Sequence, residues 1–175
     1  HEWIHGITLR TSNIVGAHTS WKISNTNFSR PTNMIDQLMA VLMWELKNAT
    51  IFGNRHNTND WSFANDYIHV QDVANAIFKS YKVLMTKTDS DTEKTYYEIF
   101  NIWSNQTVTE FKLLNRIEDI SETTIPYSID KLVKEQPSCN VNIDKAKNLL
   151  WREPEKTIFS IIQDQRKSIV SLRSN

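Results

Sequence analysis

The chain has 175 residues, of which 39% are hydrophobic and six are tryptophan, so it can form the core of one compact domain rather than a disordered segment. Twenty acidic and twenty basic residues balance to a formal net charge of zero, which argues against a protein that binds along nucleic-acid phosphates. The sequence has no run of about 18 apolar residues that could span a membrane, and Cys139 is its only cysteine, so we expect a reduced, cytoplasmic protein.

Glycine is scarce, because only Gly6, Gly16 and Gly53 occur in the chain, against an average of about 7% in proteins. Turns that bind a dinucleotide need glycine, since a Cβ atom would keep the backbone away from the pyrophosphate. Neither the G-x-G-x-x-G pattern nor a P-loop is present, so the chain carries no Rossmann nucleotide-binding motif of its own.

Strands and helices are predicted to alternate along the chain, which indicates the α/β class. Short β-branched and aromatic runs predict strands at 7–10, 50–52, 67–70, 96–102 and 125–129. Apolar periodicity predicts helices at 34–47, 72–85, 144–150 and 155–172, with Pro154 in the first turn of the last one. A capping-box pattern at Thr107 and Glu110 predicts one more helix, which runs to Ile120. We expect loops at 12–20, 55–65 and 87–94.

Two of these helices have an expected buried face. In 34–47 the stripe consists of Ile35, Leu38, Met39, Leu42 and Leu46. In 72–85 it consists of Val73, Ile77, Tyr81 and Leu84.

Residue types and spacings alone point to no catalytic or metal centre. The five histidines lack the spacing that a metal site needs. Ser12 and Ser20 flank His18, but no G-x-S-x-G motif supports a hydrolase. His69 follows Tyr67 in a predicted strand, where a hydrogen-bonded structural histidine is expected. Ligands in α/β folds usually bind in the loops after the strands, so a site is expected there.

Four segments have the order and spacing of a known family. ITLRTSNIVGAH at 7–18 is similar to a strand and loop of the form L-R-Y-F-N-x-x-G-A-H. ATIFGN at 49–54 with DYIHVQDVA at 66–74 is similar to the block I-F-G-x-D … R-D-Y-I-H-V-x-D-L-A. IFNI at 99–102 is similar to the strand Y-N-L, and DKAKNLLW at 144–151 to S-K-A-x-x-x-L-x-W. In all four, the chain resembles the C-terminal half of UDP-glucose 4-epimerases, which belong to the extended short-chain dehydrogenases, the NAD-dependent epimerase/dehydratase family.

This resemblance covers nearly the whole chain and implies its organisation. Residues 1–175 would be the sugar-nucleotide-binding portion: the last strands of the Rossmann sheet and a small mixed α/β substrate lobe. The half that binds NAD and carries the catalytic Tyr-x-x-x-Lys pair would be absent. The resemblance thus implies NAD as cofactor of the full-length protein and a UDP-sugar as substrate. It implies no catalytic residue in this chain, which alone should neither bind NAD nor convert substrate.

The resemblance also implies substrate contacts at particular positions. Asn13 and Asn33 would hydrogen-bond the sugar or the diphosphate. The backbone at Met34 would face the diphosphate at the start of a helix, where N–H groups favour anions. Phe52 would line the uracil pocket, and Glu135 stands where the family usually has an aspartate that holds the uridine ribose.

The resemblance implies further contacts in the first segment and at Cys139, which precedes the last segment. Thr11, Ile14 and His18 would contact the cofactor. Cys139 would limit the room around the C2 substituent of the sugar, and its small size would tolerate an N-acetyl group.

In the family, two arginines clamp the diphosphate. The resemblance places Asn65 and Leu132 at their positions, and Asn65 would still contact the substrate. An arginine provides a bidentate, permanently charged contact to phosphate that asparagine cannot reproduce. The clamp is either lost or rebuilt from Arg55, Lys131 or Lys134.

Three functions stay open at this point. The leading one is the substrate-binding portion of an NAD-dependent UDP-hexose 4-epimerase. The second is another sugar-nucleotide dehydratase, reductase or decarboxylase of the same superfamily. The third is a degenerate homologue that serves as a non-catalytic binding module. We expect neither a nucleic-acid nor a membrane partner, but self-association through surfaces that the other half would cover.

Overall fold

The computed structural model describes residues 4–24, 29–53, 57–88, 95–131, 141–150 and 153–173. Two predicted site residues, Glu135 and Cys139, lie outside these ranges, as do Arg55, Leu132 and Lys134. In chain order the elements are β1 (Gly6–Thr11), β2 (Asn13–Val15), α1 (Met34–Leu42), β3 (Ala49–Phe52), β4 (Ala64–Asn65), β5 (Tyr67–His69), α2 (Val70–Thr88), β6 (Tyr97–Ile102), β7 (Val108–Thr109), α3 (Glu110–Ser121), β8 (Tyr127–Asp130), α4 (Asp144–Leu149) and α5 (Ile158–Arg173).

The strands form parallel pairs separated by helices, so the predicted α/β class is confirmed. β1 pairs with β6, β2 with β5 and β3 with β8, each in parallel, whereas β4 and β7 are antiparallel. Parallel neighbours need a crossover connection, and α2, which follows β5 in the chain, lies within the connection from β1 to its partner β6.

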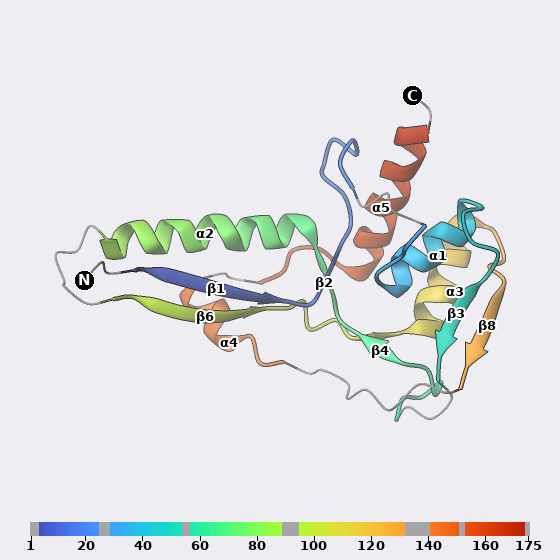
Figure 1. Cartoon of the computed structure of the whole chain (residues 1–175), viewed down its shortest axis with the longest axis horizontal. Helices are drawn as coiled ribbons and strands as arrows, with labels where there is room; N and C mark the ends of the chain where they lie inside the picture. Colours follow the sequence, from blue (N-terminus) through green and yellow to red (C-terminus); the bar gives the residue numbers. More distant parts are fainter. Residues whose placement is uncertain are drawn as a thin grey trace.

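One part of the molecule is a layer built on the β1–β6 pair (Figure 1). In that view α2 runs along one side of the pair and α4 lies on the other, so both faces are partly covered, as parallel strands require. The buried residues shared by these elements are Ile68, Val73, Ala76, Phe100, Ile102, Ala146 and Leu150.

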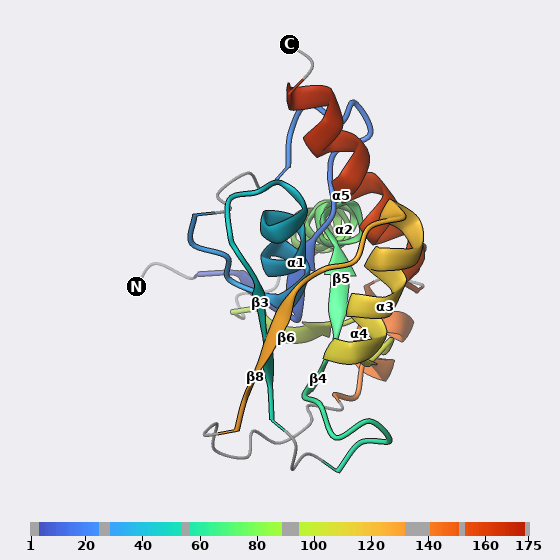
Figure 2. The same ribbon diagram turned by 90° about the vertical axis from the view of Figure 1, so that its right-hand side faces the viewer.

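The other part is a larger core between α1, α3, α5 and the β3–β8 pair. Figure 2 shows β3 and β8 side by side, with α1 and α3 next to them. Its fully buried side chains include Ile35 and Leu38 of α1, Ile51 of β3, Leu113 of α3 and Ile162 of α5. α5 contacts β5, and it thereby connects this core to the β1–β6 layer.

Helix α1 is shorter than predicted, because it ends at Leu42 instead of continuing to 47. The backbone reverses at Trp44, which has a left-handed φ of 62°.

 The N–H of Trp44 donates to the Val41 carbonyl oxygen and that of Glu45 to the Ala40 oxygen, which is the pattern of a Schellman turn. The apolar spacing continues past the turn, and periodicity alone therefore placed the helix end too late.

Helix α2 buries a different face from the predicted one. Val73 is buried, but Ile77 and Tyr81 are each 56% exposed, and the side of the helix that faces the strands instead carries Ala76 and Ser80. Apolar residues cover more than one side of this helix, so the spacing did not identify the buried side. We call its exposed apolar residues the α2 outer stripe: Val70, Ile77, Phe78, Tyr81 and Met85.

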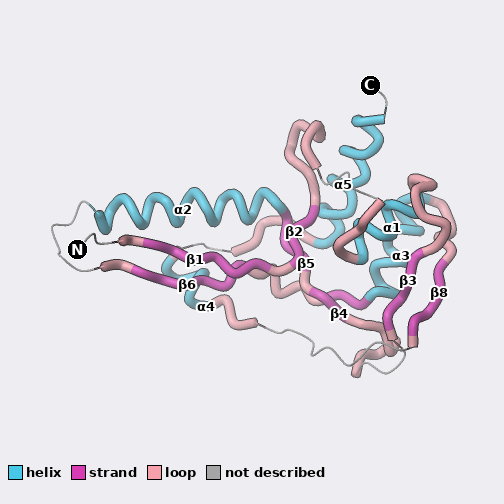
Figure 3. The backbone as a smooth tube through the Cα atoms, viewed as in Figure 1, coloured by secondary structure: helices cyan, strands magenta, loops and turns pink. Residues whose placement is uncertain are grey.

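Two segments predicted as loops contain short strands, drawn in magenta in Figure 3. β2 lies within the predicted loop 12–20, and β4 lies within 55–65. The second segment is not a surface loop at its end, since Ser62 and Ala64 are buried. Strands of two or three residues are too short to give a periodic signal, which explains both errors.

The starts of two helices also differ from the prediction. The N-cap of α3 is Thr109, whose hydroxyl accepts the Lys112 N–H, and not Thr107. The last helix begins at Ile158, so Pro154 precedes it instead of lying in its first turn. None of the helices in the described ranges is long and apolar enough to cross a membrane.

Candidate ligand-binding site

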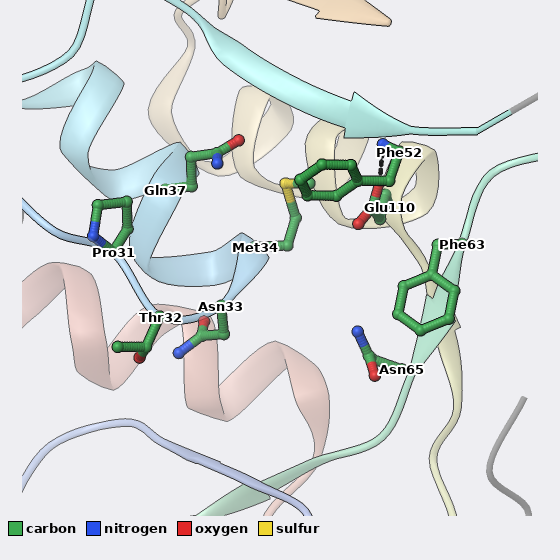
Figure 4. Close-up of a pocket in the computed structure, with 9 residues that line it drawn as sticks. All are labelled: Pro31, Thr32, Asn33, Met34, Gln37, Phe52, Phe63, Asn65 and Glu110. Carbon is green, nitrogen blue, oxygen red and sulfur yellow. Dashed lines mark hydrogen bonds between the residues drawn. The ribbon is translucent and has the colours of Figure 1, made fainter. Parts of the chain in front are cut away.

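A cavity of about 400 Å³ opens between the start of α1, the end of β3, β4 and the start of α3. This volume is in the range of pockets that bind small molecules. Figure 4 shows the side chains around it. The residues that line it are Pro31, Thr32, Asn33, Met34, Gln37, Phe52, Phe63, Asn65 and Glu110.

The N-terminus of α1 forms one wall of the cavity. Asn33 is the N-cap: its Oδ1 accepts the Asp36 N–H at 3.0 Å, and its Nδ2 donates to Asp36 Oδ2 at 2.8 Å. First-turn N–H groups and the helix dipole favour an anion at this end. The buried Asp36 carboxylate already offsets part of that positive potential, so a bound anion would gain most from direct hydrogen bonds.

Apolar side chains form the opposite walls. Phe52 ends β3, Phe63 precedes β4, and Met34 extends from α1 between them and Asn33 (Figure 4). Flat apolar walls of this kind suit a planar ring. Asn65, from β4, supplies a neutral amide on the side nearest Phe63.

Glu110 closes the cavity at the start of α3. Its Oε2 accepts the Phe52 N–H at 2.6 Å, and its own N–H donates to the Phe63 carbonyl oxygen at 2.9 Å. Burial raises the pKa of the Glu110 carboxyl to about 7; the hydrogen bond from Phe52 opposes this rise, and the nearby Asp60 adds to it. A carboxyl with this pKa changes charge close to neutral pH.

Sequence reasoning missed Glu110 as a site residue and gave it only a capping role. The capping-box pattern did place it in the first turn of a helix, but nothing in the sequence indicated that this turn meets the end of β3. Gln37 was missed for the same reason. It lies one turn into α1, and its Oε1 accepts the Thr50 N–H at 2.6 Å.

The structure brings four of the predicted substrate residues together around the cavity: Asn33, Met34, Phe52 and Asn65. They come from three segments that are well separated in the sequence. Asn13 does not line this cavity; it lies in β2, where its Nδ2 donates to the Asp66 carbonyl oxygen at 3.3 Å.

The residues expected to contact a cofactor form a separate group. Thr11 ends β1, and Ile14 is exposed in β2. His18 lies in the exposed turn that follows, where its Nδ1 is 2.9 Å from Ser20 Oγ. The described residues contain no group of three or more acidic, histidine or cysteine side chains that could hold a metal ion.

His69 has the structural environment expected for it. Its Nδ1 accepts the Gln71 N–H at 3.1 Å, and its Nε2 lies 3.4 Å from Asp164 of α5. Burial lowers the pKa of this histidine, and the nearby Lys156 contributes to the decrease. Gly16 has a φ of 92°, and a Cβ there would lie 2.4 Å from the imidazole ring, so only glycine fits against His69.

No family model matches the chain. Among curated proteins, the UDP-glucose 4-epimerase of Bacillus subtilis is 26% identical over 165 residues, which is 94% of this chain and 46% of that protein. The UDP-glucose 4-epimerase of Caenorhabditis elegans is 29% identical over 128 residues, which is 73% of this chain and 35% of that protein. The chain is related to UDP-glucose 4-epimerases. It spans about half the length of the curated relatives it matches, which fits the predicted correspondence to their C-terminal portion.

Solved epimerase structures have the same fold. The UDP-glucose 4-epimerase from Stenotrophomonas maltophila, with bound NAD and formylated UDP-arabinopyranose, superposes with a TM-score of 0.86 at 24% identity, over 99% of this chain and 50% of that one. The enzyme from Bifidobacterium longum, in complex with NAD+ and UDP, gives a TM-score of 0.78 at 23% identity, over 94% and 47%. The predicted fold, part of an extended short-chain dehydrogenase, is therefore confirmed.

Proposed function

We propose that the chain binds the UDP moiety of a sugar nucleotide in the cavity at the start of α1, as the substrate-binding portion of an NAD-dependent UDP-hexose 4-epimerase. The observation that carries this proposal is the convergence of Asn33, Met34, Phe52 and Asn65 on one cavity. The relatives support the same ligand class, since solved neighbours are described with UDP or a UDP-sugar.

The cavity provides separate environments for the two parts of the ligand. The diphosphate would lie at the N-terminus of α1, where the Asn33 amide and the backbone N–H of Met34 would be its donors. The uracil ring would lie between Phe52 and Phe63. Glu135 and Cys139, which lie outside the described residues, stay predicted contacts of the ribose and the sugar.

In the full-length protein, bound NAD would supply hydride-transfer chemistry at C4 of the hexose. The residues present fit only a small part of such a cofactor, because Thr11, Ile14 and His18 are not accompanied by a glycine-rich phosphate turn. We therefore propose that the chain alone binds no NAD and is inactive, and that its contribution is to hold the substrate. Interconversion of UDP-galactose and UDP-glucose by the purified chain would contradict this. A cytoplasmic location stays part of the proposal.

Calorimetric titration of the chain with UDP, UDP-glucose and UDP-N-acetylglucosamine tests the binding proposal. We expect all three to bind, and Asn33→Asp to weaken binding by about 10-fold. Aspartate keeps an N-cap oxygen for the Asp36 N–H and places a carboxylate beside the diphosphate, but it loses the hydrogen bond to Asp36 Oδ2, so circular dichroism should first verify that the variant keeps its helices. Asn142→Asp, ahead of α4 and away from the cavity, is the matched control, because Asn142 Oδ1 likewise accepts an N–H, from Asp144.

One observation favours a second candidate function, that of a degenerate homologue that serves as a non-catalytic binding module. Among the described residues that line the cavity there is no arginine or lysine, and the resemblance implies that Asn65 stands where the family has an arginine. Phosphate binding without a guanidinium depends on neutral donors alone. If the wild-type chain binds none of the three UDP ligands, this second function replaces the first.

We further propose that the chain self-associates through the α2 outer stripe, with a second copy as the occupant. In the described part of the chain, β1 and β6 form a sheet of two strands, and parallel sheets are normally wider and covered on both faces. Ile77, Phe78 and Tyr81 are each 56% exposed beside it. A contiguous apolar patch of this kind is typical of an interaction surface.

A further inference from the structure

The cavity at the start of α1 has one titratable side chain, Glu110, among the described residues that line it. The residue is buried, and no described arginine or lysine joins it in the lining. A buried carboxylate without a cationic partner is poorly solvated, which favours the neutral acid. Burial accordingly raises the pKa of this carboxyl to about 7. The wall of the cavity therefore contains a group that can gain or lose a proton near neutral pH.

The hydrogen bonds of this carboxyl determine which oxygen carries the proton. Oε2 accepts the Phe52 N–H at 2.6 Å, so this oxygen keeps a lone pair directed at β3. In the neutral acid the proton therefore belongs on Oε1. Figure 4 shows the carboxyl between Met34 and Phe63, with the dashed line marking its contact to Phe52. Protonation can thus change the charge of the cavity wall without breaking the contact that holds Glu110 to β3.

The groups that surround Glu110 are acidic or neutral. Burial alone would raise the pKa of Asp60, but hydrogen bonds from neighbouring hydroxyls lower it, so Asp60 stays ionised ahead of β4. Burial raises the pKa of the Tyr67 phenol in β5, so it stays neutral. From α1, the Asp36 carboxyl accepts the Asn33 amide. β3, β4 and β7 contain no charged side chain.

The helix that packs along α3 does not neutralise this group either. Arg166 of α5 donates to the Ile120 carbonyl oxygen, at the opposite end of α3 from Glu110. In the described part of the chain, Glu110 therefore has an acidic neighbour in Asp60 and no basic one in the cavity.

An anion bound in the cavity would act on Glu110 in two ways, and both favour the neutral acid. Its negative charge repels the carboxylate, and the repulsion is strongest where little water remains. The ligand also displaces water from the cavity wall, which removes solvation from an ionised oxygen. Binding should therefore raise the pKa of Glu110 further, and by linkage the protonated protein should bind the anion more tightly.

We propose that an anionic ligand binds in this cavity with uptake of a proton from solvent by Oε1 of Glu110. In the neutral form this oxygen presents a hydroxyl donor, and in the ionised form it opposes the ligand's charge. The inference rests on the proposed function, because the anion is the diphosphate of the sugar nucleotide assigned to the same cavity. The affinity of the site is thereby set by pH, and it falls as the pH rises.

Calorimetric titration of the full chain with UDP-glucose counts this proton. Both phosphates of UDP-glucose are esterified, so the ligand lacks the terminal phosphate that titrates near pH 6 to 7 in UDP. Titrations in Tris and in HEPES, which differ in ionisation enthalpy, give the number of protons taken up per ligand. We expect on the order of half a proton at pH 7.5 and close to none at pH 5.5, where Glu110 is already neutral. The dissociation constant should rise by about 10-fold from pH 6 to pH 8.5.

Two variants separate the titration of Glu110 from its structural contact. Glu110→Gln keeps an oxygen for the Phe52 N–H but cannot ionise, so its proton uptake should vanish and its affinity should not depend on pH. Glu118→Gln is the matched control, because Glu118 Oε1 also accepts a backbone N–H, from Ile125 at 2.7 Å, but does not line the cavity. The control should keep the uptake and the pH dependence of the wild type.

The possible failures are distinguishable. If UDP-glucose binds to the wild type without proton uptake at pH 7.5, or with proton release, the inference is wrong and the proposed function stands. Uptake that persists in Glu110→Gln would assign the proton to another group and also overturns the inference. If that variant does not fold, the wild type decides alone, and equal uptake at pH 5.5 and 7.5 contradicts the inference. If the wild type binds no UDP ligand at either pH, the proposed function fails and this inference fails with it.

Discussion

At the scale of single residues, Glu110 couples the cavity to pH. Glu110 is buried, with 3% of the residue exposed, and burial raises the pKa of its carboxyl from 4.5 to about 7. A raised pKa in the folded state means that folding favours the protonated form. The stabilisation is therefore fully present below about pH 4.5 and is lost as the pH rises through 7.

We accordingly expect the free energy of unfolding to fall between pH 5 and pH 8 by on the order of 2 kcal/mol because of this group. Urea unfolding of the wild type and of Glu110→Gln at both pH values would measure it. The variant cannot ionise at this position, so its pH dependence should be flatter. Equal slopes in the two proteins would show that Glu110 does not have the raised pKa.

Trp44 is the second residue with a clear energetic consequence. It is 91% exposed and has a φ of 62° at the end of α1, a conformation that favours glycine. Trp44→Gly should raise the free energy of unfolding by about 1 kcal/mol, because the left-handed backbone then lacks a Cβ clash. Trp44→Ala keeps the Cβ and is the matched control, with little expected gain. Equal stabilisation by both variants would attribute the effect to loss of the exposed indole instead.

At the scale of elements, α2 carries apolar side chains, the α2 outer stripe, that the described part of the chain leaves exposed. Its outer stripe should bury against a second copy, as proposed above. Ile77→Lys with Tyr81→Lys should convert an associated species to a monomer, because charges would then have to be desolvated in the interface. Light scattering after size-exclusion chromatography measures the mass.

The control for this experiment lies on the same helix. Asn75→Lys adds a charge at an exposed, polar position and should leave the mass unchanged. A monomeric wild type over the micromolar range, or equal masses for all variants, would contradict self-association through the stripe.

The elements also show how far the sequence could predict the fold. The existence and type of the longer helices and strands were predicted correctly, because periodicity and β-branched runs are local properties. The end of α1 at Leu42 was not, since the left-handed Trp44 in the turn that follows has no sequence signal. The buried face of α2 was predicted wrongly, because Ile77 and Tyr81 fit a helical stripe as well as Val73 does.

Part of the lining of the candidate cavity was predicted, and this prediction came from the family resemblance, not from periodicity. Asn33, Met34 and Phe52 were placed in it by the family resemblance, and their proximity depends on α1 meeting β3 in the tertiary structure. Gln37 and Glu110 were missed because their role arises from a strand edge that only the fold brings to them. Polarity and spacing in the sequence do not contain that information.

At the scale of the whole molecule, two cores are connected through β5. The strand pairs with β2, contacts α5 and continues directly into α2. Asp72, at the start of α2, accepts the N–H groups of Glu155 and Lys156 at 3.1 and 3.3 Å and so fixes the segment that leads to α5. These contacts connect the core that carries the cavity to the β1–β6 layer.

The central claim is that UDP binds in the cavity between α1, β3 and α3. Hydrogen exchange of the full chain, followed by mass spectrometry with and without saturating UDP, tests it most directly. We predict slower exchange in peptides that cover 31–37, 49–53 and 62–65, and no change in 95–102. Unchanged exchange at the cavity, or protection confined to peptides from β1 and β2, would contradict the account.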